Sequence, residues 1–199
     1  MSKILKKIKS TKRDYTDYLF HFTRQRKVYD DSQDFLDRKV IAEFTAFDVL
    51  KQILNSGKLN GRIGYAPEKC VCFSETPIDE LVWLMSQEEW EHDSRYTFYG
   101  VAVKKTWLYG QGGRPVIYQQ SAEKDLLHAD HKFRHNRYEP ANDIDFSWER
   151  EWRIKTDALD LDSNETIVIC ATAGEAKEIM TNQFANISWL ATSIELLRR

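Results

Sequence analysis

Short stretches of alternating aromatic and β-branched residues constrain the fold of this chain more than any other feature of its sequence. Side chains on a strand point alternately to two faces, so such stretches predict strands. They occur at residues 17–23, 69–74, 95–105, 115–119, 146–154, 166–171 and 186–191. Because these strands do not alternate regularly with helices, we expect an α+β fold with a mixed or antiparallel sheet core and flanking helices.

Apolar faces and capping residues mark the predicted helices, which fall at residues 45–59, 75–91, 121–139, 174–183 and 192–199. Thr45 and Asp48 form a capping-box-like start for the first helix, and Gly57 supplies its left-handed end. Thr76 is expected to cap the second helix. The polar residues 24–39 predict a loop between the first strand and the first helix.

The 199 residues are enough to bury a core without disulfides or metals. We expect a single domain at residues 14–199, because no linker, repeat or low-complexity tract interrupts it. Residues 1–13 predict a short basic arm before this domain. Two interpretations of the arm stay open: a solvated terminus, or a contact with a partner or with the phosphates of a nucleic acid through Lys6, Lys7 and Lys9.

Charge and hydropathy exclude some classes of partner. The net charge is −2 and the pI is about 6.2, so no overall field attracts nucleic acid or an anionic membrane, and only local basic clusters can do so. No stretch approaches the roughly 18 apolar residues of a membrane helix. The start of the chain also lacks the apolar region of a secretory signal. We therefore expect no contact with a membrane.

The three cysteines, Cys70, Cys72 and Cys170, indicate a reducing, cytoplasmic environment, because an odd count without spaced pairs argues against a disulfide framework. Cys70 and Cys72 would face the same side of one strand. We interpret them as small buried hydrophobic residues rather than zinc ligands, since no second pair accompanies them. No metal is expected.

The run "FSWEREWRI", residues 146–154, combines charged and aromatic side chains in a regular alternation. As one strand it would present two faces, with Trp148, Arg150, Trp152 and Ile154 on one and Glu149, Glu151 and Arg153 on the other. Two carboxylates on one face repel each other unless water or a cation lies near them. Two interpretations stay open: a solvated sheet face, or a site where a carboxylate stabilises positive charge on a substrate sugar.

The segment "HADHKFRH" would place His128, His131 and His135 on one face of a helix, a spacing that zinc can use. It also carries Arg134, and Arg137 follows it, so a solvated basic face is the simpler interpretation. If the protein binds nucleic acid, these two arginines are candidates for contacts with phosphates.

The order of several short motifs resembles the AbiGi-type abortive phage resistance family. The motifs are "YLFHFT", "ILNSGKL", "VCFSETP", "YGVAVKKTW", "RPVIYQ" and "EREWRI", and they span residues 18–155. The same order is more distantly similar to the ADP-ribosyltransferase fold of DarT-type toxins and diphtheria-toxin-like enzymes. This resemblance implies an ADP-ribosyltransferase-like sheet and NAD as a substrate.

The resemblance also implies roles for individual residues. His21 and Thr23 on the first strand would hold the adenosine ribose of NAD, with Ser74 on the second strand. Glu151 would be the catalytic carboxylate, held beside His21 in one cleft, and Glu149 would complete an E-x-E pattern. Considered alone, His21 is more simply an ordinary strand residue.

Two arginines would complete this site. Arg62, in a glycine-bearing loop, would anchor the pyrophosphate of NAD by paired hydrogen bonds. Arg153, on the same strand face as Glu151, would orient that carboxylate.

Two hypotheses from different classes follow. In the first, the protein is an NAD-dependent mono-ADP-ribosyltransferase toxin in antiphage defence, through abortive infection or a toxin–antitoxin system. It would modify RNA, DNA or a host protein and be controlled by a cognate antitoxin or partner protein. In the second, it is a non-catalytic binding or regulatory module of the same fold, such as an antitoxin or nucleotide sensor. A metal-dependent nuclease that uses the histidine segment is a third alternative.

Overall fold

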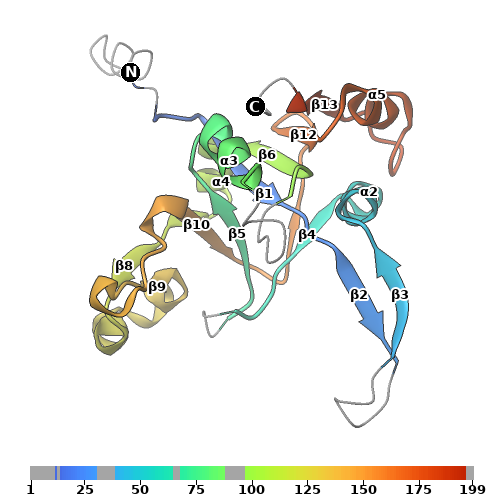
Figure 1. The fold of residues 1–199 in the computed structure, drawn as a ribbon. Helices are drawn as coiled ribbons and strands as arrows, with labels where there is room; N and C mark the ends of the chain where they lie inside the picture. The colour runs from blue at the N-terminus through green and yellow to red at the C-terminus, as the bar shows by residue number, and fades with distance from the viewer. Residues whose placement is uncertain (1–11, 13, 31–38, 65–67, 88–96, 196–199) are drawn as a thin grey trace. The chain divides into compact units, whose positions relative to one another are not determined.

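The computed structural model describes residues 12, 14–30, 39–64, 68–87 and 97–195 (Figure 1). Within these ranges, no helix has both the length and the apolar character needed to cross a membrane. The predicted basic arm, with Lys6, Lys7 and Lys9, lies outside the described residues, so its role stays a prediction.

Thirteen strands and four α-helices make up the described part of the chain. The strands are β1 (Tyr18–Phe22), β2 (Arg26–Tyr29), β3 (Val40–Phe44), β4 (Lys58–Asn60), β5 (Cys70–Ser74), β6 (Gly100–Lys104), β7 (Arg114–Pro115), β8 (Ile117–Gln119), β9 (His135–Arg137), β10 (Glu151–Lys155), β11 (Ala158–Asp160), β12 (Thr166–Cys170) and β13 (Leu190–Ser193). The helices are α2 (Ala46–Ser56), α3 (Ile78–Met85), α4 (Lys105–Gly110) and α5 (Ala173–Thr181). Short 3₁₀ helices are η2 (Ser121–Leu126), η3 (Ala129–Arg134), η4 (Pro140–Asn142) and η5 (Ser147–Glu149).

Seven strands are hydrogen-bonded in the order β13-β12-β6-β1-β5-β10-β7. The pairs β1–β5, β5–β10 and β10–β7 are antiparallel, whereas β12 and β13 are parallel. The other six strands form three separate pairs, β2–β3, β4–β11 and β8–β9. The pairs β2–β3 and β8–β9 can be followed in Figure 1. This mixed, mostly antiparallel sheet with a few helices confirms the predicted α+β class.

Contacts along the chain define two units, which we describe one at a time. The first consists of Met1–Phe20, Asn60–Leu81 and Val103–Leu159, and the second of His21–Leu59, Val82–Ala102 and Asp160–Arg199. The prediction of one domain over residues 14–199 stays a prediction.

In the first unit, alternation along β5 and β10 separates an apolar face from a polar face. Val71 and Phe73 of β5 are buried, and Val71 lies opposite the buried Ile154 of β10. The alternate residues of β5, Cys72 and Ser74, point to the other face, where they lie opposite the charged residues Arg153 and Glu151 of β10. The period-two pattern predicted for residues 69–74 is therefore present, and its polar face carries the candidate site.

In the second unit, α2 buries one side of an amphipathic helix. Leu50 and Leu54 of α2, four residues apart, expose no surface, and neither do Val168 of β12 and Ile179 of α5. This i, i+4 spacing places both leucines on one helix face, as the sequence predicted.

Both ends of α2 confirm the capping residues that the sequence predicted. The Thr45 hydroxyl accepts a hydrogen bond from the amide of Asp48, whose carboxylate accepts one from the Thr45 amide. Gly57 ends the helix with a φ of 65° in the left-handed region, where a side chain would be strained.

Two sequence predictions of strands and loops need correction. Arg26–Tyr29, predicted as loop, forms β2, because it finds an antiparallel partner in β3. The strand predicted at 95–105 is shorter in the structure: β6 runs from Gly100 to Lys104, and α4 begins at Lys105. The amide of Lys105 donates to the carbonyl of Asp17, and the next turn buries Leu108 completely.

The predicted helix at residues 121–139 is also wrong. The segment forms η2 and η3, followed by strand β9. It has too few apolar residues for a buried helix face, and Leu126 is 79% exposed. Separate local caps, at Gln120 and at His128, begin the two short turns instead.

We expect Thr45→Ala to lower the free energy of unfolding by about 1 kcal/mol, because it removes the side-chain acceptor of the α2 capping box. Urea denaturation followed by circular dichroism measures this change. Thr181→Ala is the matched control: its hydroxyl donates only to the Lys177 carbonyl within α5, so stability should not fall. Equal losses in both variants would contradict the capping role of Thr45.

Candidate functional site

The candidate site is built on three neighbouring strands of the first unit. Phe20 of β1 lies opposite Ser74 of β5, which in turn lies opposite Glu151 of β10. Cross-strand partners project from the same face of a sheet, so these three side chains form one row. The structure thus brings together two predicted site residues, Ser74 and Glu151, that are far apart in the sequence.

The carboxylate of Glu151 is buried and held by two partners. Arg153 donates from Nε to Oε1 at 2.7 Å and from Nη2 to Oε2 at 2.8 Å, which is the bidentate geometry of a strong ion pair. Asn136 of β9 donates to Oε2 at 2.9 Å. Glu151 is therefore fixed in orientation, as expected from the predicted pairing with Arg153.

Arg153 is itself 4% exposed and makes further bonds to the backbone. Its Nη1 donates to the carbonyls of His135 at 2.7 Å and Phe133 at 3.2 Å. Burial by itself would lower the pKa of the Arg153 guanidinium, but the hydrogen bonds to Glu151 and its negative charge outweigh burial and raise the pKa. All of these contacts are internal, so Arg153 positions Glu151 rather than reaching for a cofactor.

Tyr118 of β8 is a site residue that the sequence did not single out. The backbone amide of Glu151 donates to its hydroxyl at 3.0 Å. Burial, followed by the negative charges of Glu151 and Glu149, raises the pKa of Tyr118 to about 12. The phenol therefore keeps its proton at neutral pH. The pairing of β7 with β10 and of β8 with β9 brings it here, and no signal in the sequence "PVIYQ" reveals either pairing.

Glu149 does not lie on the strand with Glu151, so the prediction that both project from one strand face is wrong. Residues 147–149 form the 3₁₀ turn η5, and Arg150 adopts a φ of 45° before β10 begins at Glu151. Glu149 is nonetheless buried, and its carbonyl accepts a hydrogen bond from the Ser74 hydroxyl at 2.7 Å. Its carboxylate is close enough to influence Tyr118, so the two acidic residues converge without sharing a strand.

Cys72 lies beside this row, opposite Arg153 on β5. It is exposed, whereas the sequence predicted a buried cysteine. Partial desolvation by neighbouring protein atoms, the charge of Glu151 and a hydrogen bond to Glu151 all raise the pKa of Cys72 well above its ordinary value. Cys70 is buried, as predicted, and Cys170 is buried as well.

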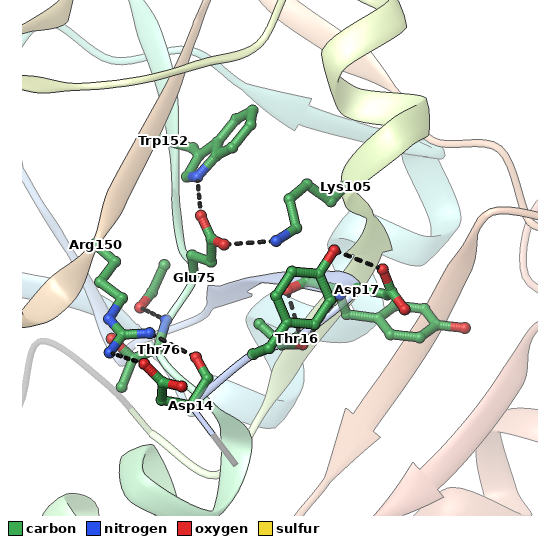
Figure 2. Close-up of polar contacts among 11 residues, drawn as sticks. Asp14, Thr16, Asp17, Glu75, Thr76, Lys105, Arg150 and Trp152 are labelled. Carbon is green, nitrogen blue, oxygen red and sulfur yellow. Dashed lines mark hydrogen bonds and ion pairs between the residues drawn. The ribbon is translucent and has the colours of Figure 1, made fainter. Parts of the chain in front are cut away.

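The opposite face of β10 carries a second polar cluster (Figure 2). Trp152 donates from its indole nitrogen to Glu75 at 2.6 Å, and Lys105 contacts the other carboxylate oxygen of Glu75 at 2.5 Å. The ammonium group of Lys105 also lies 4.3 Å from the ring centroid of Tyr15. Because Glu75 bonds to both Trp152 and Lys105, we interpret this cluster as a structural tie between β5, β10 and α4.

The turn before β10 is tied down next to this cluster. Arg150 donates to the carbonyl of Asp14 at 2.6 Å, and Figure 2 shows the two side chains close together. The Thr76 hydroxyl donates to the carbonyl of Trp148 at 2.6 Å. This bond ties the segment before α3 to η5, and the capping of α3 by Thr76 stays a prediction.

The predicted NAD-binding residues are distributed between the two units. Thr23 belongs to the second unit and is buried, with its hydroxyl donating to the carbonyl of Ala46 at 2.8 Å. His21 also belongs to the second unit, and alternation along β1 turns its side chain away from the face of Phe20. The structure therefore does not place His21 in the row of Ser74 and Glu151.

Arg62 lies in the first unit but at the other end of β5. It forms an isolated bridge with Cys70, four residues from Ser74. At about 3.3 Å per strand residue this is roughly 13 Å along the backbone. Arg62 is exposed there, so the structure does not bring it to the Ser74–Glu151 row.

The histidine segment does not form the predicted helical face. His128 and His131 are exposed at η3 and touch edge to face, with ring centroids 6.3 Å apart. His135 is buried at the start of β9, where its ring bonds to the carbonyl of Gln120. Among the described residues, no group of three histidine, cysteine or carboxylate side chains is arranged to hold a metal.

Comparison with known proteins identifies no relative. No family model, curated protein or solved structure matches the chain. The functional interpretation therefore depends on the geometry of the site and on the motif resemblance.

We expect Arg153→Met to lower the free energy of unfolding by roughly 3–5 kcal/mol, because it leaves the buried Glu151 carboxylate without its cation. The double variant Glu151→Leu with Arg153→Met should recover most of this loss, since it removes both charges. Denaturant unfolding of the single and double variants measures the difference. A double variant as unstable as Arg153→Met would show that altered packing, not the unpaired charge, is responsible.

We expect iodoacetamide to alkylate Cys72 at pH 8 at least about tenfold more slowly than a cysteine in an unstructured peptide. The thiolate is the reactive form, and each unit of raised pKa lowers its fraction about tenfold. Mass spectrometry of digests taken over time gives the rate, and the urea-unfolded chain is the control. A folded-state rate equal to that of the unfolded chain would contradict the raised pKa of this thiol.

Proposed function

We propose that the protein is an NAD-dependent ADP-ribosyltransferase acting in antiphage defence, with Glu151 as its catalytic carboxylate. One observation carries this proposal: the three strands that bear the motifs, β1, β5 and β10, are neighbours in the sheet. Ser74 is the direct cross-strand partner of Glu151. The motif resemblance requires these three strands to lie side by side. Their positions in the sequence do not by themselves ensure this arrangement.

The chemistry of the reaction matches the environment of Glu151. Breaking the bond between nicotinamide and ribose develops positive charge on the sugar, which a fixed carboxylate stabilises. Arg153 and Asn136 hold that carboxylate in place before a substrate arrives. A group that is already oriented needs no rearrangement during the reaction, and this is where electrostatic catalysis gains most.

A substrate hydroxyl has one place to bind on this carboxylate. An ionised carboxylate offers about four acceptor positions. Three are taken by two bonds from Arg153 and one from Asn136, and the fourth interaction is with the thiol of Cys72. A thiol is a weak donor, so a ribose hydroxyl would displace it readily. Tyr118, neutral at physiological pH, adds a hydroxyl next to the same residue.

A non-catalytic binding module of the same fold is the second candidate. The observation that favours it is that the carboxylate of Glu151 already accepts three hydrogen bonds, two from Arg153 and one from Asn136. A buried pair of this kind stabilises the position of its strand without any substrate. In this alternative, the chain binds a nucleotide and does not cleave it.

We expect Glu151→Gln to lower nicotinamide release and ADP-ribose transfer by about 10²–10³, the usual cost of one electrostatic contact to a transition state. The wild-type protein is incubated with labelled NAD and total cellular RNA, DNA and protein, and the labelled fraction identifies the acceptor. Glu75→Gln is the matched control, because it makes the same change in an ion pair on the opposite face of β10. It should keep its activity.

Both variants lose an ion pair, so their unfolding curves are measured and assays are run where each is folded. Glu151→Gln with wild-type activity would remove Glu151 from the mechanism. A wild-type protein that binds NAD but releases no nicotinamide with any acceptor would instead support the binding module.

A further inference from the structure

Two arginines of the first unit, Arg114 and Arg134, lie close together without a carboxylate partner among the described residues. Arg114 begins β7, and Arg134 ends η3. Both are partly buried, so their charges are neither fully solvated nor neutralised by the protein. A pair of this kind is unfavourable unless an anion occupies the space next to it.

The guanidinium of Arg114 is fixed by its own loop. Its Nη1 donates to the carbonyl of Tyr109 at 2.8 Å and to that of Gly113 at 2.7 Å. Its central carbon lies 3.8 Å from the ring centroid of Tyr109, a stacked cation–π contact. An arginine has five N–H groups, so three of them have no protein acceptor among the described residues.

Arg134 is anchored to the residue that follows Arg114. Its Nε donates to the carbonyl of Pro115 at 3.0 Å, which leaves the four N–H groups of Nη1 and Nη2 unused within the described part of the chain. This hydrogen bond places Arg134 beside the backbone of β7, at the residue directly after Arg114. Burial, and then the positive charge of the nearby Arg114, lower the pKa of Arg134.

Neighbouring cations in the same segment are already neutralised. Lys132 pairs with Asp125 at 2.7 Å, and Arg137 pairs with Glu139 at 2.7 Å. Arg137, predicted from the sequence as a phosphate contact, is thus engaged with a carboxylate. Arg134, the other predicted contact, is not, and the structure supplies Arg114 as its companion.

We propose that Arg114 and Arg134 form a binding site for a phosphate group, carried either by a nucleic-acid strand or by the pyrophosphate of NAD. Two fixed guanidinium forks offer about seven N–H donors, and planar, paired donors match phosphate oxygens. The exposed ring of Tyr109, with 54% of its surface accessible, lies beside the site and provides a surface on which a base can stack. This site stands whether or not the chain transfers ADP-ribose.

The test compares binding by the full chain and by Arg114→Gln with Arg134→Gln. Fluorescence anisotropy with labelled single-stranded RNA and DNA oligonucleotides tests the nucleic-acid source, and calorimetry with NAD tests the other. We expect the double variant to bind one of these probes at least about tenfold more weakly. For the oligonucleotides, the slope of log affinity against log salt should become shallower by about 0.7 for each phosphate that the variant no longer neutralises.

Lys132→Gln is the matched control, because it removes one charge from the same segment at a residue that already has a partner. Arg134→Gln alone is the second variant, since Arg134 has a single bond to the backbone and its loss should leave the fold intact. Weaker binding of the oligonucleotides alone assigns the phosphate to nucleic acid, and weaker binding of NAD alone assigns it to the cofactor. Unchanged affinity for every probe, or an equal loss in Lys132→Gln, overturns the proposal.

Discussion

The buried ion pair between Arg153 and Glu151 is the interaction on which the first unit depends. Removing two charges from water is costly, and the cost is offset only when the geometry is good and the remaining donors are bonded. Here the bidentate contact satisfies the carboxylate, while Arg153 also donates to the carbonyls of Phe133 and His135. The pair thus ties the segment between η3 and β9 to β10.

This tie determines where other site residues lie. Because β9 pairs in parallel with β8, fixing β9 also fixes Tyr118, whose hydroxyl accepts the amide proton of Glu151. Asn136, also on β9, reaches the same carboxylate. One charge pair therefore assembles a group of polar side chains from β8, β9 and β10. A site that is held together in this way is ready for a substrate without rearrangement.

Alternation along β10 keeps two charged clusters apart. Glu151 and Arg153 face the row of Ser74. Trp152 points to the other side, where it donates to Glu75, which also pairs with Lys105 (Figure 2). Both clusters contain a carboxylate and a cation, yet only the first lies beside Ser74 and Tyr118. Arg114 of β7 is the cross-strand partner of Arg153 of β10. The first arginine of the pair therefore lies one strand, about 4.8 Å, from the strand that carries Glu151. The two proposed sites are therefore neighbours in the first unit.

Local sequence signals were enough for the elements whose stability is local. The capping box of Thr45 and Asp48, the end of α2 at Gly57 and the alternating strand at residues 70–74 all follow from interactions within a few residues. Sequence also indicated that Arg153 would pair with Glu151, because i and i+2 on a strand share a face. The helix predicted at residues 121–139 was wrong, because short capped turns form at residues 121–134 and β9 pairs with β8.

By itself, the sequence determined an α+β chain, its capped helix and a strand with acidic and basic residues on one face. Only the tertiary structure decided that Glu149 leaves that strand, that the hydroxyl of Tyr118 bonds to Glu151, and that Arg134 bonds to the backbone next to Arg114. These outcomes depend on strand pairing and on the loss of water around charges. Both are set by contacts between distant segments, and the periodicity of a single segment carries no information about them.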